Sequence, residues 1–324
     1  MNDMDNTLPV QYFSTVVAKT VEWLWFPYIP YGKITVIQGD PGDGKTTLIL
    51  NIAALLSKGQ PMPNAETAGA VTKIIYQSAE DGAEDTIKPR LLSAGANCEQ
   101  IAFINEPEQG LTLNDARLEA TIRETGARVM VVDPLQGYLR GRSEMNRAAG
   151  IRPIMKRLAE IAERTGCAIV IIGHMNKSIG SKSIYRGLGS IDITASARSV
   201  LLVGRLKSNP SIRVMAQIKN SLAKEGTPIA FELNEDSGIR WIGEYDISVD
   251  ELLAGSGDGA IVESGKLSDA MQMLEDILQD GEIACTEIYD RFQETDISKR
   301  TVDSAKKMLE VKSIKRTDGW YWSL

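Results

Sequence analysis

A glycine-rich stretch with one lysine and two threonines carries the clearest chemistry in this sequence. The β-branched run 33–38 ends at a glycine, and the residues that follow complete the pattern G-x-x-x-x-G-K-T. This pattern is the phosphate-binding P-loop, in which glycines allow backbone N–H groups to face phosphate oxygens. We expect Lys45 at the β- and γ-phosphates and Thr46 on Mg²⁺. The predicted nucleotide-binding residues are Gly39, Asp40, Pro41, Gly42, Asp43, Gly44, Lys45, Thr46 and Thr47.

The surroundings of the motif favour this interpretation over a chance glycine-rich turn. Average composition would produce the pattern by accident in on the order of one chain in a hundred of this length. Here a strand precedes it, and residues 46–57 have the apolar spacing of a helix. The N-terminus of such a helix attracts anions. The sequence therefore predicts a site for a nucleoside triphosphate, ATP, with Mg²⁺.

Acidic and imidazole side chains follow other strands of the expected sheet. The strand 128–132 runs into Asp133, which matches the Walker B position and predicts a second Mg²⁺ contact. The strand 72–77 is followed by Glu80, and the strand 168–172 by His174, which is the only histidine. A lone histidine is usually structural, but the carboxyl ends of parallel strands are where α/β sheets bind ligands. We therefore interpret His174 as functional.

Length and composition bound the class of protein. The chain has 324 residues, of which 43% are hydrophobic, and this is enough for two domains. Its formal net charge of −7 argues against a uniformly basic surface. Its three cysteines are far apart, so neither a disulfide framework nor a zinc site is expected. We find no apolar run long enough for a membrane span and no signal peptide, and we expect a cytoplasmic protein.

The order of strand and helix patterns predicts an α/β fold. Buried strands alternate with helices up to the strand 168–172, and after a loop at 178–190 a series of strands follows from residue 199 to residue 242. This favours a mostly parallel sheet with an antiparallel flank, over a domain of residues 1–245 with a lead-in at 1–32. The lead-in contains an aromatic run, 21–30. It is either a stacking platform for a base or a neighbouring subunit, or an apolar segment packed on the sheet edge, which we favour.

The C-terminal part has a different pattern. Residues 246–264 include a glycine-rich stretch typical of a linker. Residues 265–324 predict three helices and a β-hairpin with an Asp-Gly turn, a winged helix-turn-helix arrangement. From residue 298 onward, seven basic residues stand against three acidic ones. We interpret this unit as DNA-binding, although a small helical domain that binds protein or dimerises is the alternative. The candidate DNA contacts are Lys299, Arg300, Lys306, Lys307, Lys315 and Arg316.

On these motifs, the chain resembles RecA-fold ATPases of the RepA, DnaB and RadA type. More closely, it is similar to RepA-like AAA proteins of phages, plasmids and integrative elements. The similarity covers most of residues 21–243, and the tail 297–322 also resembles the C-terminal domain of those proteins. The resemblance implies that Glu80 activates the attacking water, that Arg90 contacts phosphate, and that His174 is a γ-phosphate sensor.

The resemblance also implies a contribution from a neighbouring subunit. Lys219 falls where DnaB-type helicases have a Lys-x-Arg pair that reaches the neighbour's γ-phosphate, but Ser221 replaces the arginine. Arg198 and Arg205 are two possible substitutes, between which the sequence does not decide. The loops after Asp133 and His174 correspond to DNA-binding loops, for which solvated surface charge is an equal alternative. Their basic residues are Arg140, Arg142, Arg147, Lys177, Lys182 and Arg186.

Together these features predict an ATP-hydrolysing motor on DNA, assembled as a homo-oligomeric ring hexamer with single-stranded DNA at its core. Helicase or translocase activity in replication or recombination of a mobile element would follow. The first alternative is an ATP-gated DNA-binding loader or regulator. The second is a small-molecule kinase, which is disfavoured because no arginine-rich lid is evident and the tail would be unexplained.

Overall fold

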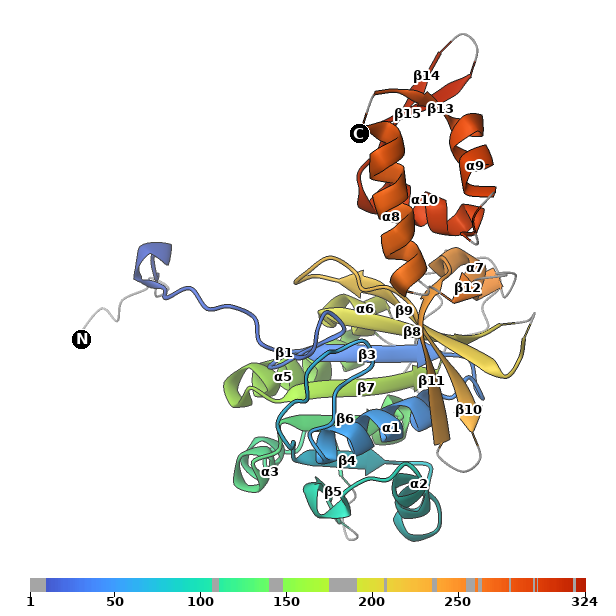
Figure 1. Ribbon diagram of the computed structural model, residues 1–324. Helices are drawn as coiled ribbons and strands as arrows, with labels where there is room; N and C mark the ends of the chain where they lie inside the picture. Colours follow the sequence, from blue (N-terminus) through green and yellow to red (C-terminus); the bar gives the residue numbers. More distant parts are fainter. Residues whose placement is uncertain are drawn as a thin grey trace.

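The computed structural model describes residues 10–106, 111–139, 148–174, 191–206, 209–234, 238–254, 260–261, 264–279, 281–293, 295, 297–316 and 319–324. Figure 1 shows a large α/β body with a small helical unit at one end. No helix in these ranges is both long and apolar enough to cross a membrane.

A ten-stranded sheet forms the large body, in the order β12-β11-β10-β9-β8-β3-β7-β6-β4-β5. The strands β8, β3, β7, β6, β4 and β5 are parallel, and β9 to β12 add an antiparallel flank. This confirms the expected mostly parallel sheet. The strands are β3 (Ile34–Gly39), β4 (Ile74–Ser78), β5 (Ile101–Ala102), β6 (Val129–Asp133), β7 (Ala168–His174), β8 (Ser199–Arg205), β9 (Ile212–Asn220), β10 (Ile229–Asn234), β11 (Gly238–Asp246) and β12 (Ala260–Ile261).

Helices cover both faces of the parallel part, which is why its strands are apolar on both sides. On one face, Ile37 packs with apolar residues of α1 (Lys45–Ser57) and α2 (Lys88–Ser93), the latter preceded by a π-helical turn, Ala83–Ile87. On the other face, Val36 packs with residues of α3 (Leu118–Thr125), α5 (Ala148–Thr165) and α6 (Ile191–Ser196). The side chains of successive strand residues thus pack into the cores on opposite faces of the sheet.

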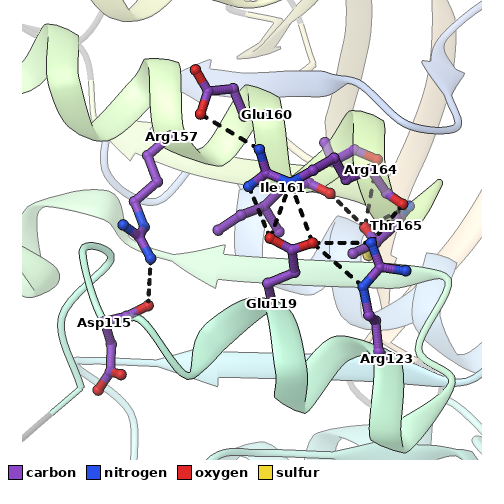
Figure 2. Close-up of polar contacts among 10 residues, drawn as sticks. Asp115, Glu119, Arg123, Arg157, Glu160, Ile161, Arg164 and Thr165 are labelled. Carbon is purple, nitrogen blue, oxygen red and sulfur yellow. Dashed lines mark hydrogen bonds and ion pairs between the residues drawn. The ribbon is translucent and has the colours of Figure 1, made fainter.

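An ion-pair cluster joins α3 to α5 on the second face (Figure 2). Glu119 accepts hydrogen bonds from Arg164 (2.8 Å) and from Arg123 (2.9 Å), and Arg123 also donates to the Arg164 carbonyl. The two guanidinium groups hold the pKa of Glu119 at about 2, mainly through the Arg164 hydrogen bonds. The cluster therefore favours the docked helices only while Glu119 is ionised.

The aromatic lead-in packs against the body of the protein, as favoured from the sequence. It forms a small hairpin of β1 (Trp23–Trp25) and β2 (Ile29–Pro30). Trp25 is buried and packs against Tyr28 with the ring centroids 4.6 Å apart and the planes tilted by 50°. The Tyr28 hydroxyl donates to the Thr227 carbonyl. Phe26 remains exposed.

The segment expected to be a linker contains regular structure. Helix α7 (Val249–Ala254) places Leu252 in a core beside Gly204, and β12 pairs with β11. The sequence pattern missed this because the glycine-rich stretch 255–259 dominates the local composition, and that stretch lies outside the described residues.

The C-terminal unit has its own core. It contains α8 (Ser264–Leu278), α9 (Cys285–Gln293) and α10 (Lys299–Met308), with β13 (Ile283–Ala284), β14 (Lys312–Lys315) and β15 (Trp320–Ser323) in the order β13-β15-β14. Leu274, Ile288, Val302 and Trp322 are buried together. The three expected helices and the hairpin are present, and the short strand β13 is an addition.

Candidate nucleotide-binding site

The P-loop joins β3 to α1 through two residues in left-handed conformations. Gly42 has φ +82° and Gly44 has φ +89°. A residue with a side chain would adopt these backbone angles only with strain. Gly39 is required for a different reason, because a Cβ there would collide with the Val203 carbonyl of the adjacent strand. The loop is thus shaped by glycines and presents its backbone before the N-terminus of α1.

Lys45 lies folded into this loop. Its Nζ donates to the Gly39 carbonyl at 2.9 Å and to the Asp40 carbonyl at 2.7 Å. Burial lowers the pKa of Lys45, while nearby Asp43 and Asp133 oppose the shift. The residue is only 4% exposed, and its ammonium bonds to loop carbonyls, so its charge lies where an anion in the loop would bind.

Asp133, at the end of β6, is brought next to the P-loop threonine. Its Oδ2 accepts hydrogen bonds from Thr46 Oγ1 (2.8 Å) and from the hydroxyl of Tyr76 (2.7 Å). Burial raises the pKa of Asp133, whereas the two hydrogen bonds lower it. A hydroxyl and a carboxylate at this separation are oxygen ligands of the kind that Mg²⁺ takes, and Mg²⁺ typically completes its shell with phosphate and water.

The segment after β4 lies at the same edge. Ser78 Oγ accepts from the Asp81 backbone N–H, which fixes the turn containing Glu80. Glu80 is exposed, and its charge is close enough to act on both Lys45 and Asp133. Arg90 reaches this turn from α2 and pairs with Asp81 at 3.1 Å. The turn is therefore held through Asp81, next to the exposed Glu80.

Arg205 contacts the P-loop of its own chain. Its Nη2 donates to the Gly42 carbonyl at 2.9 Å, and its Nε lies 3.9 Å from Asp43 Oδ1. Asp43 is 8% exposed, and its other oxygen accepts from the Asp40 N–H. Burial raises the pKa of Asp43, partly offset by that backbone hydrogen bond. Arg205 thus braces the loop in cis.

Lys219 and Arg198 lie apart from that loop. In the sheet, Lys219 lies opposite Val200, and Val200 lies opposite Val36. Lys219 is therefore level with a point on β3 three residues before Gly39. Its Nζ donates to the carbonyls of Thr194 and Ala195 at the end of α6. Burial lowers the pKa of Lys219, and the charge of Arg198 lowers it further. The exposed Arg198 is therefore its basic neighbour.

The structure adds one residue that the sequence reasoning did not single out, Tyr76, which donates to Asp133. It also gives a different contact to Arg205, which was considered only for a role on a neighbouring subunit. The position of Tyr76 offered one signal, since it stands two residues before the end of the strand that leads to Glu80. Arg205 offered none, because its contact depends on how β8 pairs with β3.

The expected sensor and the expected DNA loops are described only in part. The backbone of His174 pairs with Gly39, which places its Cα at the P-loop edge. Arg140, Arg142, Arg147, Lys177, Lys182 and Arg186 lie outside the described residues. The DNA-contact predictions for these loops stay predictions.

In the C-terminal unit, several candidate DNA contacts lie over aromatic rings. Lys306 Nζ is 4.1 Å from the centroid of Trp322, and Lys299 Nζ is 4.3 Å from that of Tyr289. Lys315 lies 5.8 Å from the ring of exposed Trp320. Arg316 instead pairs with Glu282 at 2.8 Å. The side chains of Arg300 and Lys307 are outside the described part of the chain.

Comparison with known proteins gives a consistent picture. A family model described as AAA domain matches residues 9–179. The DNA repair protein RadA of Bacillus subtilis is 26% identical over 237 residues, which are 72% of this chain and 46% of that protein. Protein RecA of Bartonella quintana is 27% identical over 307 residues, covering 87% of this chain and 81% of that protein. The chain spans about half the length of the RadA proteins it matches.

Solved structures are also similar. The RadB recombinase has a TM-score of 0.48 at 19% identity, covering 65% of this chain and 91% of that chain. A KaiC-like protein of Pyrococcus horikoshii has a TM-score of 0.49 at 16% identity, covering 66% and 90%.

Proposed function

The chain belongs to the AAA domain family, and from this premise we propose that it is an ATP-hydrolysing RecA-fold protein that acts on DNA. The observation that carries the proposal is the contact between Thr46 and Asp133 beside Lys45. It unites a hydroxyl, a carboxylate and an ammonium at the phosphate-binding end of the sheet, which is the arrangement that phosphoryl transfer needs.

We assign the nucleotide contacts as follows. Lys45 leaves the Gly39 and Asp40 carbonyls for the β- and γ-phosphates, and residues 39–47 surround the phosphates. Thr46 and Asp133 hold Mg²⁺, which when bound neutralises charge on the phosphate oxygens. In the described residues no cluster of three or more His, Cys, Asp and Glu could hold a metal on its own, as expected if phosphate supplies the other ligands.

Glu80 is the proposed base. It orients and deprotonates the attacking water, for which an exposed carboxylate beside Asp133 and Lys45 is suitable. Arg90 pairs with Asp81 in the turn, and we propose that it contacts phosphate when nucleotide is bound. His174 would report the γ-phosphate state to the loop that follows it.

The residue that acts on a neighbouring subunit is proposed to come from the pair Arg198 and Lys219. Arg205 is already used in its own P-loop, whereas Arg198 is exposed and away from it. A basic residue supplied in trans can accelerate phosphoryl transfer by about 10³–10⁵-fold. This role presupposes a homo-oligomer, for which we propose a ring hexamer.

The C-terminal unit is the proposed winged helix-turn-helix, with α10 as the recognition helix and the β14–β15 hairpin as the wing. Lys299, Lys306 and Lys315 line these elements, and basic residues over aromatic rings suit a phosphate backbone. RadA and RecA-homologue relatives are named for DNA repair, which supports a DNA substrate. A helicase or translocase of a mobile element is the specific form we propose.

A loader or regulator without motor activity is the second candidate. It is favoured by Ser221 in place of the expected arginine and by the engagement of Lys219 with α6. A motor should hydrolyse ATP faster with single-stranded DNA, should form larger particles with nucleotide, and should unwind a tailed duplex. ATP-dependent DNA binding without unwinding would select the regulator. If neither ATP turnover nor ATP-dependent DNA binding is seen under any of these conditions, both candidates are refuted.

A further inference from the structure

The wing, the β14–β15 hairpin, carries an exposed tryptophan on the same face as a buried one. Trp322 is 2% exposed and packs edge-on against Tyr289 of α9, with the ring centroids 5.2 Å apart. Trp320 lies two residues earlier on the same strand, so its side chain projects from the same face, but it is 53% exposed. The hairpin thus extends past the core of the C-terminal unit and presents an indole ring to solvent there.

A lysine lies beside each tryptophan, tightly at Trp322 and loosely at Trp320. Lys306 Nζ is 4.1 Å from the ring centroid of Trp322 and also donates to Ser313 Oγ at 2.6 Å. Lys315 stands opposite Trp320 in the hairpin register, with its Nζ 5.8 Å from the ring centroid. That distance is close to the ~6 Å limit of a cation–π contact, so little attraction is lost when the two groups separate. The outer pair therefore offers an aromatic face and an ammonium to an incoming group.

The outer part of the wing is held in a fixed shape. The Arg316 backbone N–H donates to the Gly319 carbonyl at 2.8 Å, which joins β14 to β15 beside the outer pair. The Arg316 guanidinium also pairs with Glu282, just before β13, at 2.8 Å. The indole ring is thus carried on a hairpin that is already formed, so binding to it requires little ordering of the backbone.

The wing is also the accessible part of the C-terminal unit. Figure 1 shows β14 and β15 at the end of this unit away from the large body, whereas α10 lies at the near end. There Ser304 of α10 donates to Asp246 of β11 at 3.2 Å. A ligand can therefore reach Trp320 and Lys315 while α10 stays beside the body.

The chemistry of the outer pair fits a nucleobase and its phosphate. Aromatic side chains stack on the faces of bases with little regard to sequence, and an ammonium neutralises the phosphate backbone. From residue 312 to residue 324, three basic residues stand against one acidic residue, which favours an anionic ligand. Inside a duplex, neighbouring base pairs cover both faces of each base. The indole ring can therefore stack on a base only where that base is unpaired.

We propose that Trp320 binds single-stranded DNA by stacking on an unpaired base, with Lys315 on the adjacent phosphate. This rests on the proposed function, because it assumes that the C-terminal unit binds DNA, and it names the form of DNA. The wing then selects strands that are already open, and this selection does not depend on base sequence.

Fluorescence anisotropy on the full chain without nucleotide can test the contact, with a labelled oligothymidine and a labelled blunt duplex of equal length as probes. Trp320→Ala should weaken single-strand binding at least about fivefold and change duplex binding by less than about twofold, since one stacked base is lost. Phe103→Ala removes a ring of similar exposure, 56%, from the large body and should match the parent. Unchanged single-strand binding in Trp320→Ala, an equal loss on the duplex, or a parent that binds no single strand overturns the proposal.

Two further measurements separate stacking from loss of charge or of folding. Trp320→Ala should keep the salt dependence of the parent, whereas Lys315→Ala should reduce the slope of log K against log salt by about 0.7, the share of one phosphate on a single strand. Trp320→Phe keeps a ring and should keep most of the affinity, but it should lose most of the quenching of tryptophan emission by oligothymidine. A reduced slope in Trp320→Ala, or parental quenching in Trp320→Phe, refutes the contact.

Neither measurement depends on ATP turnover, so the two proposals can fail separately. A chain that hydrolyses no ATP but shows these effects of Trp320 would refute the proposed ATPase and support the contact. A DNA-stimulated ATPase in which Trp320→Ala binds single strands normally would refute only the contact.

Discussion

Thr46 donates a 2.8 Å hydrogen bond to Asp133 across 87 residues of sequence. The contact exists because β3 and β6 are separated only by β7, so that their carboxyl ends open on the same edge. It joins the P-loop to the strand that ends at Asp133. The variants below test whether this edge performs the proposed chemistry.

Replacement of Lys45 by Ala should abolish ATP turnover and weaken ATP binding by at least about tenfold. The reason is that the Lys45 ammonium is a positive charge held within the loop, and its hydrogen bonds go to the loop carbonyls of Gly39 and Asp40. Thermal unfolding should stay close to that of the parent. A folded variant with near-normal hydrolysis would contradict the central assignment.

The base should be Glu80 and not its neighbour. Glu80→Gln should retain ATP binding and lose turnover by on the order of 10²–10⁴-fold, since the amide has the same shape but cannot accept the proton. Asp81→Asn is the matched control and should lose much less, because Asp81 pairs with Arg90. If the two variants exchange these outcomes, Asp81 is the base.

Tyr76 should set the acid limit of activity through Asp133. Its hydroxyl lowers the pKa of that carboxyl, and the carboxyl must be ionised to hold Mg²⁺. Tyr76→Phe removes the hydrogen bond, so the pKa rises and the acid limb of the pH–rate profile moves to higher pH. Tyr138→Phe serves as the control, because it changes a neighbouring buried hydroxyl with no hydrogen bond to Asp133. If Tyr76→Phe and Tyr138→Phe move the acid limb by the same amount, the shift does not arise from the hydrogen bond to Asp133.

Glu119 should make stability depend on pH through the cluster in Figure 2. Its pKa falls from an ordinary value near 4.5 to about 2 in the folded chain. The stabilisation is therefore complete above about pH 4.5 and is lost as the pH falls toward 2. Glu119→Gln should lower the melting temperature at pH 7 and differ less from the parent at pH 3. A constant difference between parent and variant at both values would exclude this linkage.

The sequence predicted the parts of the site that depend on local patterns. The P-loop residues and Asp133 are identified by motif and by position after a buried strand, and the structure brings them together. The sheet followed from strand–helix alternation. What the sequence could not predict depends on pairing between distant strands. The cis role of Arg205 requires β8 to lie beside β3, and the position of α7 requires a core at Gly204.

For the aromatic lead-in, the sequence was enough to favour packing against the body, because large apolar side chains tend to be buried. Trp25 and Tyr28 are too large and apolar to be left in water, and they pack with Trp241 and Phe231. Residues 10–21, a few positions earlier, also include several apolar side chains, and these are exposed to solvent among the described residues. Composition alone does not distinguish the two segments, because the difference lies in what each one can reach.

The last prediction distinguishes the basic residues that act on a neighbouring subunit from the one that acts within its own subunit. If Lys219 and Arg198 act in trans, a protein with Lys219→Ala or Arg198→Ala should regain ATPase activity when mixed with Glu80→Gln. Mixed rings then contain interfaces with an intact Glu80 from one subunit and an intact basic residue from the next. Arg205 contacts its own P-loop, so an Arg205→Ala protein mixed with Glu80→Gln should show no more than the summed activities. Mass measurement of the mixed oligomers must show subunit exchange. Recovery with Arg205→Ala, and none with the other two, would reverse the assignment and make Arg205 the residue that reaches the neighbouring nucleotide.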